Sequence, residues 1–296
     1  MKMLALLLSS LVLCGPLRAQ TLSPREPGRT VMVLAHRSCW EGGAPENSLA
    51  AIRACETVRP DMIEIDVRKT SDGQFVLMHD ETVDRTTNGQ GKVADLTFAQ
   101  VRALRLRAGD GGPNAPLTEL RVPTLEEGLQ AAKGKFIVNL HLYVPAEAAM
   151  ADIVTRLGMA GALTTWVGGK PDSDEMVRYP LRGVVHPIPV IKPCAGSAEP
   201  CGPTGFAVLE GFAPHRPAGY YLIPDGALAS DAGHDYVRAG ATAPRPAGTR
   251  IMVSTLFDID KLPHAALVAE WHRLMALGAD LIMTDHPGAL LEVLRQ

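Results

Sequence analysis

The sequence predicts an α/β protein folded as a single (β/α)8 TIM barrel with long loops. Short β-rich apolar runs alternate with helical patterns along most of the 296 residues, an alternation that favours a parallel sheet. No glycine-rich phosphate loop follows the first expected strand, which makes an open doubly wound sheet the weaker alternative. One barrel of roughly 250 residues would account for most of the chain.

The first half of the chain contains a polar excursion between its core elements. Residues 82–96 are polar and rich in turn formers, so we expect them outside the core. Helical patterns begin at Thr97 and at Thr124, where TLEE has the form of a capping box. The earlier elements expected, in order, are strand 31–36, helix 47–58, strand 62–67 and short strand 75–78.

The second half continues the same alternation without a linker that would separate two domains. Residues 192–204, KPCAGSAEPCGPT, form the clearest loop because glycine and proline punctuate them. We therefore expect one domain over residues 30–296. Its remaining elements are strand 136–142, a helix from Ala146, strands 163–167, 184–191, 206–212 and 251–255, helix 265–276 and strand 280–284.

The composition is that of an ordinary globular protein, with 46% hydrophobic and 21% charged residues. These values exclude a disordered chain, a collagen and a coiled coil. The 29 lysines and arginines are outnumbered by 32 aspartates and glutamates, for a formal net charge of -3. No basic excess is present to hold a nucleic acid or an anionic membrane, so we expect neither as a partner.

Residues 1–19 have the layout of a secretory signal peptide. Lys2 precedes an apolar run from Leu4 to Cys14, and the segment ends at the small residue Ala19. The run is too short to span a bilayer, and no later stretch is long enough, so we expect no stable membrane insertion. Cleavage after Ala19 predicts an exported protein, periplasmic or secreted. A lipoprotein anchored through Cys14 fits less well because Leu13 stands where a small residue is usual.

Four cysteines remain after the signal peptide, an even number that favours disulfides in an exported protein. Cys194 and Cys201 bracket the glycine- and proline-rich loop and are the pair we favour. Cys39 with Cys55 is the second pair. Neither pair has the spacing of a zinc site, and the simpler alternative is four small buried residues.

Two carboxylates share one face of an expected strand. In DMIEIDV, Glu64 and Asp66 point the same way while Ile63, Ile65 and Val67 occupy the other face. Neighbouring carboxylates inside a barrel repel each other and lose solvation, and a divalent cation compensates for both effects. The alternative is an exposed edge strand with solvated acids, which the apolar alternation disfavours.

The strand KFIVNLHLY repeats this alternation with a different polar set. Asn139, His141 and Tyr143 occupy one face, opposite an apolar face. His141 is a candidate ligand of the same metal through a ring nitrogen. The competing interpretation is a hydrogen-bonded structural histidine.

Two histidines end strands, where a barrel exposes its reacting groups. His36 closes the first strand as LAHR, and His79 closes the short strand as LMHD. Two histidines can act as general base and general acid near neutral pH. The neighbouring Arg37 offers a guanidinium fork suited to a phosphate.

These residues belong to a longer pattern that resembles the glycerophosphodiester phosphodiesterase family. The matching segments are HRSCWEGGAPENS, EIDVRKTSDGQFVLMHDETVDRTTNGQGKVADLT, VPTLEEGL and GADLIMTDHP. The resemblance implies a (β/α)8 barrel with one divalent metal ion, commonly calcium or magnesium. It implies His36 and His79 as the acid–base pair, Arg37 as a phosphate contact and Asp80 as the residue that orients the loop of His79. We assign the base role to His36 and the acid role to His79, an order that the sequence leaves open.

The same resemblance assigns the metal ligands. Glu64 and Asp66 are ligands, and Glu46 of PEN lies near or on the metal. The family usually reads N-I-E-I-K on the third strand, where this chain has His141 as the third ligand and Tyr143 in place of lysine. A nitrogen donor in place of a carboxylate favours manganese, cobalt or zinc more than an all-oxygen site does. Losing the lysine removes a positive charge near the phosphate, although Tyr143 can donate a hydrogen bond.

The leading functional hypothesis is hydrolysis of a small-molecule glycerophosphodiester to glycerol 3-phosphate and an alcohol. One alternative is phospholipase D-like action on choline (lyso)phospholipids through a cyclic phosphate, and another is an exported phosphodiester-binding protein without catalysis. Ser38 replaces the family's usual glycine, a further departure. Trp40, Tyr220, Tyr221 and Phe257 form either an apolar wall for the alcohol or part of the core. The sequence leaves the oligomeric state open.

Overall fold

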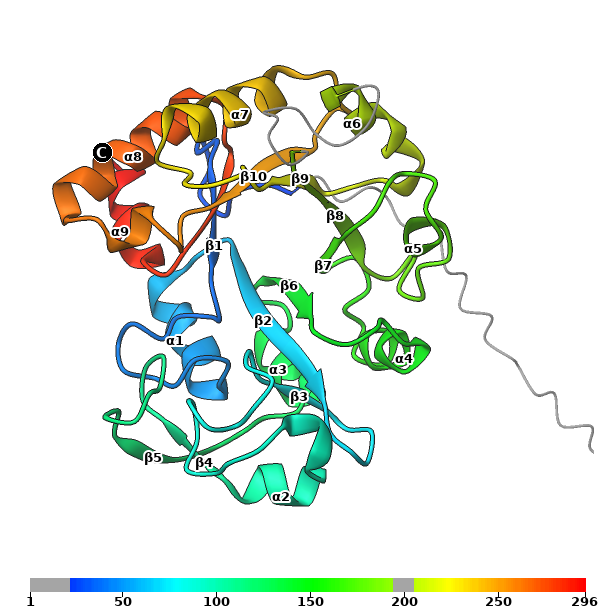
Figure 1. Ribbon diagram of the computed structural model, residues 1–296, viewed down its shortest axis with the longest axis vertical. Helices are drawn as coiled ribbons and strands as arrows, with labels where there is room; N and C mark the ends of the chain where they lie inside the picture. The colour runs from blue at the N-terminus through cyan, green and yellow to red at the C-terminus, as the bar shows by residue number, and fades with distance from the viewer. Residues whose placement is uncertain (1–21, 194–204) are drawn as a thin grey trace, which may run out of the picture.

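Eight parallel strands form a closed barrel in the computed structural model, which describes residues 22–193 and 205–296 (Figure 1). The strand order is β1-β11-β10-β9-β8-β7-β6-β2, and pairing of β1 with β2 closes the ring. The predicted (β/α)8 barrel is therefore confirmed. The barrel strands are β1 Met32–Ala35, β2 Met62–Lys69, β6 Ile137–Leu142, β7 Leu163–Val167, β8 His186–Ile191, β9 Gly219–Leu222, β10 Arg250–Ser254 and β11 Leu281–Thr284.

A helix follows each barrel strand and packs on the outside of the ring (Figure 1). The predicted capping box is present, since Thr124 accepts from the Glu127 amide and the Glu127 side chain accepts from the Thr124 amide. None of the helices in the described ranges has the length and apolarity needed to cross a bilayer. The helices are α1 Leu49–Val58, α3 Leu125–Ala132, α4 Ala148–Arg156, α5 Asp174–Val177, α6 Val208–Gly211, α7 Asp231–Thr242, α8 His264–Ala276 and α9 Pro287–Val293.

An insertion between β2 and α3 contains the polar excursion predicted from the sequence. Its strand β3 (Phe75–Leu77) pairs antiparallel with β2, and β4 (Arg105–Arg107) pairs with β5 (Leu117–Arg121) in a separate two-stranded sheet. The short helices η1 (Val93–Asp95) and α2 (Phe98–Ala103) lie between β3 and β4. A small apolar core of its own, including Val83 and Leu106, stabilises the insertion. This core lets the insertion present a fixed loop after β3.

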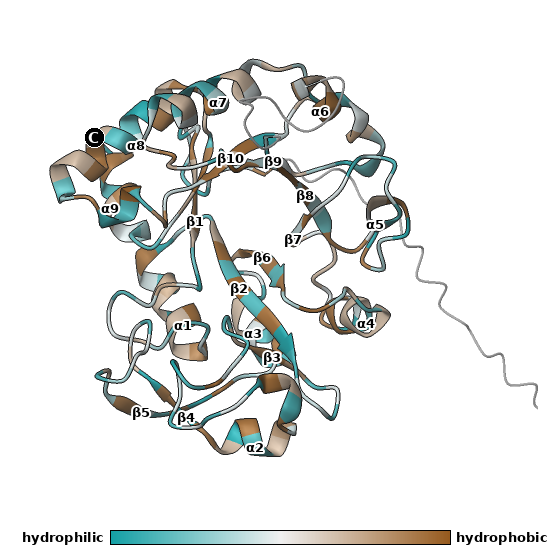
Figure 2. Cartoon of the chain, in the orientation of Figure 1, coloured by the Kyte–Doolittle hydropathy of each residue, from teal (hydrophilic) through white to brown (hydrophobic). Residues whose placement is uncertain are grey.

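The side chains of β2 and β6 alternate between an apolar outward face and a polar inward face, as predicted. Ile63 and Ile65 pack outward against the helices, whereas Glu64 and Asp66 lie on the inward face. Figure 2 shows the resulting hydrophobic and hydrophilic bands along β2. Below the carboxylates, toward the amino ends of the strands, the interior is filled by apolar residues such as Leu34 and Met62. The polar part of the interior therefore lies toward the carboxyl ends of the strands, where barrel enzymes place their active sites.

The predicted strand 206–212 is wrong. These residues form the 3-10 turn η2 (Gly205–Ala207) and the helix α6, so that Phe206, Leu209 and Phe212 lie on one apolar face. Their spacing of three residues is helical, and the high apolar content concealed this period. The barrel strand at this point is β9, whose four residues, GYYL, are too few to show an alternation.

Of the two cysteine pairs considered, Cys39 and Cys55 form a disulfide, with their Cα atoms 5.1 Å apart. The bond ties the loop after β1 to α1 across a sequence separation of 16 residues. A cross-link over a loop of this size stabilises a fold by about 3 kcal/mol. The signal peptide at 1–19 and the pair Cys194 and Cys201 lie outside the described residues.

Candidate active site

A cavity of about 670 Å³ opens at the carboxyl ends of the barrel strands. Polar and charged side chains from β1, β6, β11 and the insertion line one part of it, and aromatic and aliphatic side chains line the rest. The polar lining consists of His36, Arg37, His79, Asp110, His141, Tyr143, Lys192 and Asp285.

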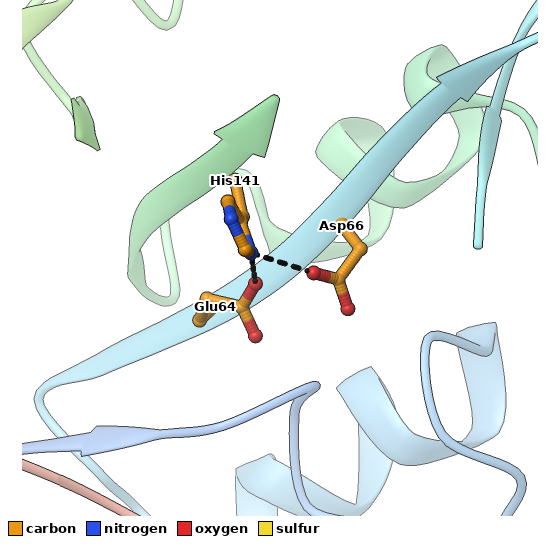
Figure 3. A group of neighbouring side chains, drawn as sticks. All are labelled: Glu64, Asp66 and His141. Carbon is orange, nitrogen blue, oxygen red and sulfur yellow. Dashed lines mark hydrogen bonds and ion pairs between the residues drawn. The ribbon is translucent and has the colours of Figure 1, made fainter. Parts of the chain in front are cut away.

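Glu64, Asp66 and His141 come together beneath this cavity (Figure 3). Parallel pairing of β2 with β6 places Asp66 opposite His141. The His141 Nδ1 atom lies 3.0 Å from Asp66 Oδ1 and 3.8 Å from Glu64 Oε1. One ligand atom from each residue lies within 4.8 Å of the other two, so three of the four residues predicted at the metal form one group.

The charges in this group are incompletely balanced by the protein. Both carboxylates are fully buried, and Glu64 Oε1 has no hydrogen-bond partner among residues 22–193 and 205–296, although Glu64 Oε2 accepts from the Arg37 amide at 2.7 Å. Burial and the neighbouring Asp66 raise the pKa of Glu64 well above its ordinary value. Burial alone would raise the pKa of Asp66 as well, but His141, His79 and His36 hold it below its ordinary value.

This environment fits a divalent metal ion. A buried, unpartnered carboxylate oxygen beside a second carboxylate and an imidazole nitrogen is an arrangement that a cation completes. Without a cation, the folded protein must either leave Glu64 protonated or keep its charge next to that of Asp66. The donor set of two carboxylates and one imidazole does not by itself select one metal.

Glu46 lies at the site, as predicted, but outside the ligand group. Its Oε2 atom accepts from Arg37 at 2.8 Å and from Arg85 at 3.0 Å, and its Oε1 atom accepts from Arg85 at 2.7 Å. Both carboxylate oxygens are therefore bound by guanidinium groups. In this arrangement Glu46 orients Arg37.

The next residue, Asn47, is a site residue that the sequence reasoning missed. Its side-chain amide donates to Asp66 Oδ2 at 2.7 Å, and its side-chain oxygen accepts from the Asp66 amide at 2.9 Å. The backbone of Asn47 has φ of 54°, a left-handed conformation that asparagine tolerates better than most residues. The PEN motif was the available signal, and Asn47 orients the Asp66 carboxylate.

His36 is held by an acidic residue from the opposite end of the chain. The His36 Nδ1 atom lies 2.8 Å from Asp285 Oδ1, and the Asp285 amide donates to Asp260 at 2.7 Å. The sequence placed Asp285 at the end of the last strand without giving it a role. Because β11 pairs with β1, the two strand ends bring the carboxylate to the imidazole.

His79 has a corresponding carboxylate partner next to it in sequence. Its Nδ1 atom lies 2.7 Å from Asp80 Oδ1, so Asp80 contacts the imidazole itself. Arg85 binds the same carboxylate through Nε at 2.8 Å and Nη2 at 2.7 Å. The hydrogen bonds from Arg85 and His79 hold the pKa of Asp80 below its ordinary value.

Arg37 and Tyr143, the predicted phosphate contacts, both line the cavity. Arg37 and Ser38 have φ of 52° and 68°, in the left-handed region that favours glycine, at the tight turn after β1. Burial would lower the pKa of Arg37, but Glu46 and Asp66 raise it, so the guanidinium stays charged. Burial, together with Asp66 and Glu64, raises the pKa of Tyr143, which keeps the phenol protonated as a donor.

The structure separates the four aromatic residues that the sequence left unassigned. Trp40, Tyr221 and Phe257 line the cavity, and Phe257 is 77% exposed. Tyr220 instead lies in the core between the barrel and the helices, where its hydroxyl donates to the Leu209 carbonyl at 2.6 Å. The apolar wall also includes Trp166, Val190, Ile223, Leu256 and Met283.

Comparison with known proteins assigns the region that carries this site. The model of the Glycerophosphoryl diester phosphodiesterase family matches residues 36–168, which include both histidines and the ligand group. Over these residues the chain is similar to the glycerophosphodiester phosphodiesterase family.

Curated members of the glycerophosphodiester phosphodiesterase family match over about a third of the chain. Glycerophosphodiester phosphodiesterase 1 of Mus musculus is 47% identical over 110 residues, which are 37% of this chain and 32% of the mouse protein. A glycerophosphodiester phosphodiesterase of Caldanaerobacter subterraneus subsp. tengcongensis is 40% identical over 112 residues, 38% of this chain and 44% of that protein. The matches thus span less than half of the length of these relatives.

Solved structures of glycerophosphodiester phosphodiesterases share the barrel over most of its length. One from Parabacteroides distasonis has a TM-score of 0.69 at 23% identity and covers 91% of this chain and 88% of its own. A phosphodiesterase from Oleispira antarctica, solved with its product sn-glycerol-3-phosphate, has a TM-score of 0.55 at 19% identity and covers 90% and 97%. At these identities the likeness establishes the fold.

Proposed function

We propose that the protein hydrolyses glycerophosphodiesters to glycerol 3-phosphate and an alcohol, using one divalent metal ion and two histidines. The observation that carries the proposal is the pairing of two imidazoles with separate carboxylates above a buried ligand group. His36 pairs with Asp285, and His79 pairs with Asp80. The similarity of residues 36–168 to the family and the names of the curated relatives support the same reaction.

The carboxylates determine which ring nitrogen is available for chemistry. When Nδ1–H donates to a carboxylate, Nε2 is the nitrogen that exchanges a proton with the substrate. One histidine takes a proton from the attacking water, and the other gives a proton to the leaving alkoxide. Arg37, held by Glu46, binds the phosphate oxygens through its guanidinium group. Glu64, Asp66 and His141 would hold the metal ion, whose charge would stabilise the phosphoryl group when bound.

The environments of the two carboxylates favour His36 as the base and His79 as the acid. Asp80 is shared with Arg85, whose positive charge reduces the ability of Asp80 to stabilise a protonated His79. Asp285 has no arginine or lysine partner among the described residues. No guanidinium or ammonium group among the described residues therefore competes with His36 for the Asp285 carboxylate, which suits His36 to the role of base.

The apolar wall favours a second candidate function, phospholipase D-like cleavage of choline (lyso)phospholipids. A further hollow of about 280 Å³ shares Tyr221, Ile223 and Phe257 with the main cavity. Together they offer apolar surface to an acyl chain. Phosphorus NMR of the products separates the two functions, because a cyclic phosphate resonates apart from a monoester.

We also propose that the protein is exported to the periplasm or secreted. The Cys39–Cys55 disulfide supports this, since such bonds persist in oxidising compartments. Intact-mass spectrometry of protein recovered outside the cytoplasm is expected to give a chain that begins at Gln20. A mass that retains residues 1–19 would contradict export by signal cleavage.

Metal-stripped protein tests the proposed reaction. Glycerophosphocholine and glycerophosphoethanolamine are supplied with calcium, magnesium, manganese, cobalt or zinc, and glycerol 3-phosphate is measured. We expect at least one metal to restore turnover. Calcium and magnesium are expected first from the likeness to the family, and the His141 nitrogen also admits manganese, cobalt or zinc. If no metal gives turnover of these substrates or of lysophospholipids, the protein is a phosphodiester-binding protein instead.

A further inference from the structure

Arg68, a residue outside the predicted catalytic set, contacts two members of that set. It follows Glu64 and Asp66 on the inward face of β2. Its Nε and Nη2 atoms both donate to the His79 carbonyl, at 2.9 and 2.7 Å. Its guanidinium carbon lies 4.3 Å from the centroid of the Tyr143 ring, within the range of a cation–π contact.

The hydrogen bonds fix a part of the chain that has no sheet partner. The strand β3 ends at Leu77, and His79 lies in the loop that follows. Asp80 holds the His79 ring, whereas the two hydrogen bonds from Arg68 are the only ones that the His79 carbonyl accepts from the described residues. A planar fork with two donors on one carbonyl restricts the orientation of that peptide more than a single donor does.

The ring of Tyr143 completes a three-way contact. Its centroid lies 5.2 Å from that of His79, with the rings nearly perpendicular. Arg68 thus touches the backbone of His79 and the face of Tyr143, while the two rings touch each other. Arg68 forms no ion pair with a carboxylate in the described ranges, so its charge stays beside these two residues.

We propose that Arg68 is a positioning residue that holds His79 for proton transfer to the leaving alcohol and keeps Tyr143 against it. Arg68 acts through the His79 backbone and the Tyr143 ring and does not exchange a proton itself. The expected effect on kcat rests on the proposed function. The structural claim, that the Arg68 guanidinium fixes the position of His79, does not.

The test compares Arg68→Met and Arg68→Lys with Arg107→Met. Arg107 is a matched control because it lies in the insertion that follows β2, is half-buried like Arg68 and also donates to carbonyls, those of Thr87 and Ala115. Each variant is assayed with glycerophosphocholine and with a p-nitrophenyl diester of glycerol phosphate. The nitrophenolate leaves without a proton, so its release does not need a general acid.

We expect Arg68→Met to lower kcat for glycerophosphocholine by about tenfold to a hundredfold, with KM nearly unchanged, because a misplaced acid loses part of its contribution. The loss with the p-nitrophenyl ester should be less than about threefold. Arg68→Lys should recover part of the activity, since an ammonium can donate to the carbonyl but lacks the planar fork. Equal losses for the two substrates, or no loss, would overturn the proposal.

A second measurement does not require turnover. In protein labelled with nitrogen-15 histidine, the His79 ring signal is assigned by its disappearance in His79→Ala. We expect this signal to shift or broaden in Arg68→Met and to keep its wild-type position in Arg107→Met. An unchanged His79 signal in both Arg68 variants would overturn the positioning role. If the wild type turns over neither substrate, the proposed function fails while this spectrum still decides the role of Arg68.

Discussion

Replacing His36 by alanine is expected to lower kcat for glycerophosphocholine by on the order of 10³-fold while the protein remains folded. The imidazole is the proposed acceptor of the proton from the attacking water. Its ring lies at the cavity wall and makes one hydrogen bond, to Asp285, so its removal leaves the core intact. Steady-state kinetics and a thermal melt of the same sample check both parts of the expectation.

His79→Ala should cause a similar loss with alkyl diesters and a small loss with the p-nitrophenyl ester, whereas His36→Ala should lose both activities. This contrast follows from the assignment of His79 as acid.

The kcat of Asp285→Asn should lie between those of the wild type and His36→Ala, since the amide cannot stabilise the imidazolium. His264, exposed at the start of α8, provides the control, and His264→Ala should keep wild-type rates. Full activity in His36→Ala would refute the two-histidine mechanism, and the reverse leaving-group pattern would exchange the roles.

Glu64→Gln is expected to stabilise the metal-free protein and to abolish its response to metal. Without a cation, the buried Glu64 carboxylate faces the Asp66 charge and leaves one oxygen unpartnered, and glutamine removes that charge. The wild type should instead gain about 2.7 kcal/mol of stability at a metal concentration 100 times its Kd. Thermal melts with a chelator and with the activating metal measure both effects. An equal metal-induced shift in Glu64→Gln and the wild type would show that the ion binds elsewhere.

The pH dependence of the stability of the metal-free protein tests whether the Glu64 charge causes this difference. The pKa of Glu64 is raised by folding, so the folded state binds its proton more tightly than the unfolded state. Glu64 therefore costs the metal-free protein no stability below pH 4.5, its ordinary pKa. The free energy of unfolding falls as the pH rises from there toward the pKa of Glu64 in the folded state. The advantage of Glu64→Gln should vanish in acid and grow toward neutral pH. Glu119→Gln, at an exposed position on β5, should behave like the wild type at every pH.

The sequence alone was sufficient to predict the features that depend on local structure. An alternation of period two identified the inward faces of β2 and β6, and with them Glu64, Asp66 and His141. The TLEE capping box located the start of α3 within one residue. These features were predictable because side-chain direction in a strand and capping at a helix end depend on neighbours in the sequence. The same reasoning failed at 206–212 and at β9, where short elements carry too few residues to show a period.

The sequence by itself therefore determined the fold class, the ligand group and the two histidines. Only the tertiary structure decided which partners hold them. Asp285 reaches His36 across 249 residues because β11 closes the barrel against β1. Glu46 of the loop after β1 joins Arg37 to Arg85 of the insertion, and Arg68 of β2 joins the loop of His79, because these segments meet at the carboxyl ends of β1 and β2. Such contacts depend on which strand ends lie next to each other in the folded protein. The periodicity of a sequence reports only local structure and does not predict them.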